Sequence, residues 1–151
     1  MVGLSALVVA RVMTSFGANA EGSGVNAKNV YLGGGLGFNS GANGFQFFGG
    51  YDFDFILNED ISTAVELGYM DTGDFGNDTN AKGVWLAVLE SVPLSSKTDM
   101  LVRFGVDFGD DDGLLFGAGL QYKFNTKAAF RVEHVVRENI NSLQANVLFK
   151  F

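Results

Sequence analysis

The sequence predicts an all-β fold, an eight-stranded antiparallel transmembrane β-barrel with up-and-down connections, a polar lumen and lipid-facing aromatic side chains. Along most of the chain, apolar residues recur at every second position, which is typical of strands with two unlike faces. The chain has 21 Gly and 15 Phe but one Pro, a composition that suits a small membrane barrel. No stretch approaches the roughly 20 apolar residues of a spanning helix, and a sheet in lipid must close because an open edge leaves backbone groups unsatisfied.

The first 20 residues are predicted to form a secretory signal peptide. An apolar core at 4–13, interrupted by Arg11, precedes the small-residue sequence Ala18-Asn19-Ala20, which is typical of a cleavage site. No Lys or Arg precedes the apolar core, and the alternative is an amphipathic helix that stays attached. Residues 21–28 are expected to be a periplasmic lead-in.

Strand-like segments fill the chain from 29 to 151. Each is close to the 9–11 residues, roughly, that a tilted strand needs to cross a bilayer. The eight segments lie at 29–39, 45–55, 61–70, 82–92, 99–108, 113–124, 127–137 and 143–151. The connections at 57–60, 93–97 and 125–127 are short and are predicted to be periplasmic turns, whereas those at 39–43, 71–81, 109–112 and 138–141 would face outward. Both termini then lie in the periplasm.

The hairpin at 45–70 predicts which face of the barrel is outside. Phe45, Phe47, Tyr51 and Phe53 alternate with Gln46, Phe48, Gly50 and Asp52. A whole row of large aromatic residues is too bulky to line a small barrel, so we expect this row to face lipid and the polar row to face the lumen. The alternative is a soluble, lipocalin-like barrel that binds an apolar ligand, which requires the opposite facing.

The same hairpin resembles the second and third strands of the OmpA-like transmembrane domain. The matching residues are Phe45, Phe48, Gly49, Gly50 and Tyr51, then Ala64, Glu66, Leu67, Gly68, Tyr69, Asp71 and Gly73, with further matches at 81–84, Pro93, Leu94, Arg103 and Gly105. We expect no second domain after Phe151, and hence a barrel-only protein similar to the OmpX-like group. The resemblance implies a Gram-negative outer-membrane protein with a structural envelope role and at most a narrow, mostly closed, porin-like pore.

Four charged residues are predicted to meet in the lumen. Glu66, Arg103, Arg131 and Glu133 all fall on the inward phase of their strands, and they should form a buried ion network because an unpaired charge there costs several kcal/mol. In the OmpA-like family, a Glu matching Glu66 and an Arg matching Arg131 are thought to act as a gate. The family's alternative partners, a Lys and a Glu, correspond here to Leu89 and Gln121, which favours a structural plug over a switch.

Two further features concern the ends of the barrel. Phe149 and Phe151 end an alternating apolar strand, which resembles the signal read by the outer-membrane assembly machinery. Asp110, Asp111 and Asp112 lie in an outward connection, where carboxylates suit divalent cations that bridge lipopolysaccharide. Since the three are consecutive rather than spaced as in a calcium loop, the simpler interpretation is a solvated rim, and no metal site is predicted.

The remaining function classes are weighed against single features. A net charge of −7 argues against nucleic acid as a partner, so the expected partners are outer-membrane lipid, lipopolysaccharide and the assembly machinery, with the chain a monomer and no cofactor. A lipid A-modifying enzyme needs a His with a nearby Ser, but the only histidine, His134, is predicted to face lipid, and Ser142 is the closest serine. We therefore predict no catalytic residues. An adhesin role would depend on the outward connection at 71–81.

Overall fold

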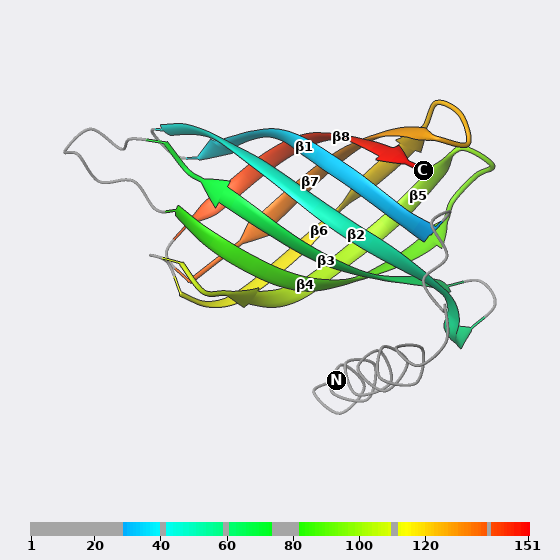
Figure 1. Ribbon diagram of the computed structural model, residues 1–151, viewed down its shortest axis with the longest axis horizontal. Coiled ribbons are helices and arrows are strands. Elements are labelled where there is room, and N and C mark those ends of the chain that lie inside the picture. Colours follow the sequence, from blue (N-terminus) through cyan, green and yellow to red (C-terminus); the bar gives the residue numbers. More distant parts are fainter. Residues whose placement is uncertain (1–28, 40–41, 59–60, 74–81, 110–111, 139) are drawn as a thin grey trace.

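The computed structural model describes residues 29–39, 42–58, 61–73, 82–109, 112–138 and 140–151. These residues form eight strands in one closed, entirely antiparallel barrel in which each strand pairs with its neighbours in sequence and β1 pairs with β8 (Figure 1). The predicted fold class is therefore confirmed. Nowhere in these residues is there a helix long and apolar enough to span a membrane. The strands are β1 (Val30–Asn39), β2 (Ala42–Asn58), β3 (Ile61–Asp71), β4 (Lys82–Pro93), β5 (Thr98–Asp107), β6 (Gly113–Lys123), β7 (Ala128–Val136) and β8 (Asn141–Lys150).

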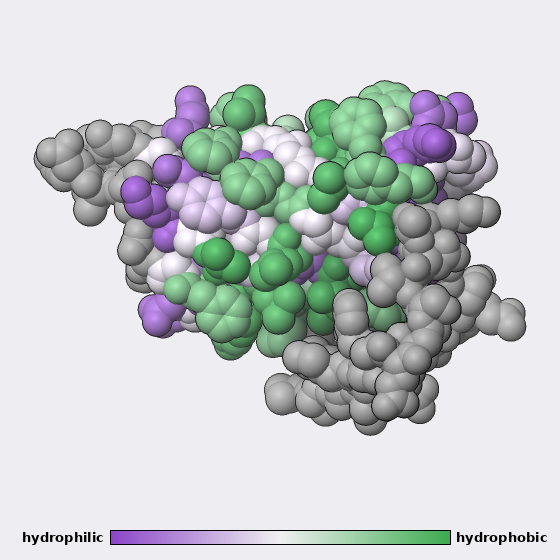
Figure 2. Space-filling model, viewed as in Figure 1, coloured by the Kyte–Doolittle hydropathy of each residue, from purple (hydrophilic) through white to green (hydrophobic). Residues whose placement is uncertain are grey.

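The outer wall of the barrel is apolar. Leu36, Phe47 and Phe116 are each more than half exposed, and on the face seen in Figure 2 the hydrophobic side chains cover the middle of the wall, with hydrophilic residues toward the two ends. An exposed apolar surface of this extent is typical of a lipid-facing wall. The facing predicted from the hairpin is confirmed, and the opposite facing that a lipocalin-like barrel requires is not present.

The strand bounds differ from the prediction mainly in the first hairpin. The connection expected at 57–60 is shorter, because β2 continues to Asn58, which pairs with Ile61 at the start of β3. The register of this pair shifts between Phe53 and Asn58. A bulge of this kind lets a strand run on past its neighbour while the alternation in the rest of the barrel stays in phase. Residues 59–60 lie outside the described part of the chain.

The two ends of the barrel differ in their connections. At one end, here called the short-turn end, the chain turns at 94–97 and 124–127, and β1 begins beside the end of β8 with Tyr31 paired to Lys150. Asn125 closes the second turn by accepting hydrogen bonds from the amides of Lys127 and Ala128 at 2.8 Å each. The opposite end, here called the loop end, holds the connections from β1 to β2, β3 to β4, β5 to β6 and β7 to β8.

Inward glycines make room for the aromatic side chains inside the barrel. A Cβ on Gly33 would lie 2.4 Å from the ring of Phe48, one on Gly50 would lie 2.2 Å from the ring of Tyr31, and one on Gly68 would lie 2.4 Å from Trp85. Each glycine is the direct cross-strand partner of the residue that carries the ring. The alternation of large and small inward residues therefore lets a narrow barrel hold three large side chains.

Candidate functional site in the barrel lumen

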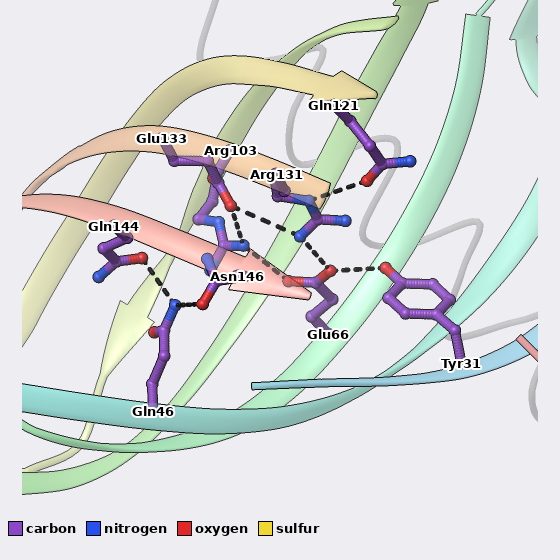
Figure 3. A network of polar contacts seen from close by, with 9 residues as sticks. All are labelled: Tyr31, Gln46, Glu66, Arg103, Gln121, Arg131, Glu133, Gln144 and Asn146. Carbon is purple, nitrogen blue, oxygen red and sulfur yellow. Dashed lines mark hydrogen bonds and ion pairs between the residues drawn. The ribbon is translucent and has the colours of Figure 1, made fainter. Parts of the chain in front are cut away.

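The lumen brings together the four charged residues that the sequence places there. Glu66 extends from β3, Arg103 from β5, and Arg131 and Glu133 from β7, and all four side chains are almost completely buried (Figure 3). Their inward direction follows from the two-residue period of each strand. Together these four residues are called the ion network below.

Glu66 is the centre of the ion network. Its Oε1 accepts hydrogen bonds from the Tyr31 hydroxyl at 2.6 Å and from Arg131 Nη1 at 2.7 Å, and its Oε2 accepts one from Arg103 Nη2 at 2.8 Å (Figure 3). Charge-assisted bonds of this length are strong in a water-poor interior. One carboxylate thus ties β3 to β1, β5 and β7 across the barrel.

Glu133 closes the ion network with weaker contacts. Its Oε1 lies 2.9 Å from Arg103 Nη2 and 3.5 Å from Arg131 Nη1. Among the described residues, Glu133 Oε2 and Arg103 Nε have no hydrogen-bond partner although both are buried. The two arginines balance the two glutamates, so the ion network carries no net charge.

An aromatic pair, Phe48 and Trp85, covers the loop-end side of the ion network. The two ring centroids are 5.8 Å apart, and the guanidinium of Arg103 lies 4.7 Å from the Trp85 ring centroid. The Arg131 guanidinium lies 5.6 Å from the Phe48 centroid. Both cations are within the range of a cation–π interaction, so the aromatic pair stabilises the arginines on the side where no carboxylate meets them.

The lumen continues as packed polar contacts from the aromatic pair to the loop end. Gln46 Nε2 donates to Gln144 Oε1 at 2.9 Å and to Asn146 Oδ1 at 2.8 Å (Figure 3). Farther along, Arg137 Nε donates to Asp107 Oδ2 at 3.0 Å. The cavity beside Asn39, Gln46 and Ser142 at this end has a volume of only about 10 Å³, so the described side chains pack closely around it.

The short-turn half of the lumen is hollow instead. A cavity of about 440 Å³, called the vestibule below, has Tyr31, Gln121 and Arg131 among its lining residues. Around its mouth lie Lys123, Lys127 and Lys150, together with Asp52 and Asp99. Exposed turn residues of 125–127 also line it, so it opens to solvent at this end.

Sequence reasoning missed two polar partners of the ion network. The Tyr31 hydroxyl donates a hydrogen bond to Glu66, and Gln121 Oε1 accepts a hydrogen bond from Arg131 Nε at 2.9 Å. Tyr31 shares the inward phase of Gly33, Gly35 and Gly37, and this phase was the signal that could have found it. Leu89, which replaces a charged residue of the family pattern, lies buried in the wall of the vestibule.

The other predicted site residues lie outside the lumen or outside the described chain. Phe149 and Phe151 are exposed, at the short-turn end. Asp112 is exposed, whereas Asp110 and Asp111 lie outside the described residues, as do the predicted signal peptide and lead-in. Within the described residues, no group of three or more His, Asp or Glu side chains could hold a metal ion.

His134 and Ser142 lie on opposite faces of the barrel wall. His134 is exposed on the outside of β7, and Ser142 is buried on the inside of β8, where its hydroxyl bonds to Asn39. The two side chains therefore cannot form the Ser–His pair that nucleophilic catalysis requires.

A comparison with known protein families finds one that matches most of this chain. The family model of the OmpA-like transmembrane domain matches residues 16–150. A comparison with curated protein sequences finds no match.

Solved structures show the same fold at low sequence identity. The N-terminal β-barrel domain of Pseudomonas aeruginosa OprF is 17% identical with a TM-score of 0.58, over 82% of this chain and 98% of that one. The Yersinia pestis outer membrane protein Ail in a phospholipid bilayer nanodisc is 12% identical with a TM-score of 0.57, over 81% and 98%. A de novo designed transmembrane β-barrel is 16% identical with a TM-score of 0.60, over 84% and 98%.

Proposed function

The chain belongs to the family of OmpA-like transmembrane domains, and we propose that it serves a structural role in the Gram-negative envelope, with a lumen that is plugged rather than conducting. The observation that carries this proposal is the pair of successive barriers in the lumen. Glu66 ties β3 to β1, β5 and β7, and the aromatic pair of Phe48 and Trp85 fills the next layer toward the loop end.

Two barriers in series argue against a simple gate. Opening the ion network would require one carboxylate to leave two arginines in a buried site, which costs several kcal/mol. Even then, the ring of Trp85, completely buried, and the amides of Gln46, Gln144 and Asn146 would still fill the lumen beyond it. An eight-stranded barrel is about wide enough for its own side chains, which supports a plug that holds the wall in shape.

The proposal includes an orientation in the outer membrane. The strand ends at the short-turn end would lie in the periplasm, together with both chain termini, because short periplasmic turns are the rule in bacterial outer-membrane barrels. The exposed Phe149 and Phe151 would be available to the assembly machinery during insertion. The apolar outer wall would contact the lipid and lipopolysaccharide of the bilayer, with the chain a monomer and no catalytic role.

Planar-bilayer recording of the Glu66→Gln variant tests the plugged lumen. The substitution keeps the shape of the side chain but removes the charge that holds Arg103 and Arg131. Because the aromatic pair remains, we expect no rise in open probability over the unchanged chain. Gel mobility of boiled and unboiled samples would show that the variant is folded.

Glu138→Gln is the matched control, since Glu138 is exposed at the loop end. Both variants should give the same open probability. A large rise for Glu66→Gln alone would overturn the plug and indicate that the ion network is a gate.

A further inference from the structure

The vestibule is a large cavity bordered by described residues, and Arg131 of the ion network lines it together with Tyr31 and Gln121. Its volume of about 440 Å³ lies in the range of small-molecule sites, roughly 300–1,000 Å³. The lining mixes charged, amide and apolar side chains from most strands of the barrel. Such a pocket is large enough for a ligand of several functional groups.

The floor of the vestibule presents hydrogen-bond donors. Arg131 is 3% exposed and uses Nε and Nη1 for Gln121, Glu66 and Glu133. Its second terminal nitrogen, Nη2, makes no hydrogen bond with a described residue, and in Figure 3 it points away from Glu66 toward the side of Gln121. Gln121 accepts from Arg131 through Oε1, which leaves its Nε2 amide as a second donor beside the guanidinium.

The mouth of the vestibule attracts anions. Lys123, Lys127 and Lys150 come from β6, the turn before β7, and β8, so they form an arc on neighbouring elements. Lys123 pairs with Asp99 at 2.8 Å and Lys150 pairs with Asp52, whereas Lys127 makes no ion pair with a described residue. The rim thus carries one more positive charge than negative, in a chain whose net charge is −7.

We propose that the vestibule binds a carboxylate group, with Arg131 and Gln121 as its donors and Lys127 as the cation that attracts it. A guanidinium and an adjacent amide offer N–H groups to the two oxygens of a carboxylate. The excess of one positive charge matches a monoanion, and Asp52 and Asp99 at the mouth disfavour a dianion such as phosphate. Because the cavity is much larger than a carboxylate, the ligand carries further atoms.

The source of the carboxylate is a small free acid or the carboxyl end of a peptide. With the orientation proposed above, the mouth would open to the periplasm, where both occur. The site itself depends on neither the orientation nor the conductance of the lumen, so a conducting Glu66→Gln variant would leave it standing.

Nuclear magnetic resonance of the full chain in nanodiscs tests the proposal directly. The probes are acetate, N-acetylalanine, N-acetylalanine amide and inorganic phosphate. We expect the side-chain resonances of Gln121 Nε2 and Arg131 Nε to shift saturably with the two carboxylates, with a Kd in about the millimolar range, and not with the amide. The tighter carboxylate identifies the source.

Matched variants separate the site from general charge effects. Gln121→Glu keeps the acceptor for Arg131 but replaces the amide donor by a carboxylate oxygen, so binding should be lost. Lys127→Gln should weaken binding by about two- to fivefold, while Lys97→Gln, at an exposed turn position of the same end that does not line the cavity, should leave it unchanged. The proposal is overturned by equal shifts with the amide, by a preference for phosphate, or by equal weakening in the two lysine variants.

Discussion

The two halves of the lumen use charged side chains in opposite ways. In the half between the ion network and the loop end, Glu66, Arg103 and Arg131 are buried together and packed against Phe48 and Trp85. In the short-turn half, the ion pairs lie at the mouth of a water-accessible cavity, and the side chains of Lys123 and Lys150 are each 44% exposed. Arg–Glu pairs therefore fill the lumen in one half, and Lys–Asp pairs border an open cavity in the other.

This difference shows where the barrel gains its rigidity. A buried carboxylate with three donors cannot move without leaving cations unpaired in a medium of low dielectric constant. A surface ion pair is exposed to water and contributes little to the free energy of unfolding. We therefore expect substitutions of matched chemistry to have large effects in the packed half and small effects at the vestibule.

The largest effect should come from Glu66→Gln. It leaves Arg103 and Arg131 without the carboxylate that accepts from both, and we expect a loss of about 3–5 kcal/mol in the free energy of unfolding. Glu133→Gln is the matched control. The Glu133 carboxylate makes one short contact and one of 3.5 Å. We therefore expect this variant to lose only about 2 kcal/mol in the free energy of unfolding.

Urea unfolding of both variants in lipid vesicles, followed by circular dichroism, measures this difference. Equal losses for the two glutamates would show that Glu66 is not the centre of the ion network.

A second pair of substitutions compares the two halves on a single strand. Trp85 and Leu89 both point inward from β4 and are fully buried, but Trp85 packs against Phe48 and Arg103 whereas Leu89 lines the vestibule. Trp85→Ala should lower the free energy of unfolding by about 3–5 kcal/mol because it leaves a void in a packed layer. Leu89→Ala should lower the free energy of unfolding by only about 2 kcal/mol, since the space it leaves joins the existing vestibule and is not a new closed void.

The same urea titrations provide the measurement, with the mobility of unboiled samples as the check on folding. If Leu89→Ala proved as costly as Trp85→Ala, the vestibule would have to be a packed region rather than a hollow one.

Much of this contrast could be predicted from the sequence, because alternation fixes which side of the wall each residue faces. Glu66, Arg103, Arg131 and Glu133 were assigned to the lumen from the inward phase of their strands. Alternation does not say how far along the barrel axis a residue lies relative to one on a distant strand, since that depends on strand tilt and register. Hence the contact between Tyr31 and Glu66, 35 positions apart, was not predicted.

The vestibule could not be predicted for a related reason. A cavity is the volume that inward side chains fail to fill, so its position depends on how large and small residues from eight strands meet at one height. The space at Gly68 is filled by the ring of Trp85, whereas the small residues Ala64, Ser62 and Ser91 near the short-turn end line the cavity. Only the assembled barrel shows at which small inward residues a large side chain from another strand fills the space, and at which the space stays open.

The smallest effect should come from Lys123→Gln, which breaks the pair with Asp99 at the mouth of the vestibule. Because the lysine side chain is 44% exposed, we expect a loss of at most about 1 kcal/mol at low salt, and less at about 1 M salt, where the Debye length falls to about 3 Å. Glu66→Gln, measured in the same two salt concentrations, should keep its full effect because the ion network is shielded from solvent. A salt-independent loss of several kcal/mol for Lys123→Gln would mean that the rim, too, belongs to the rigid part of the barrel.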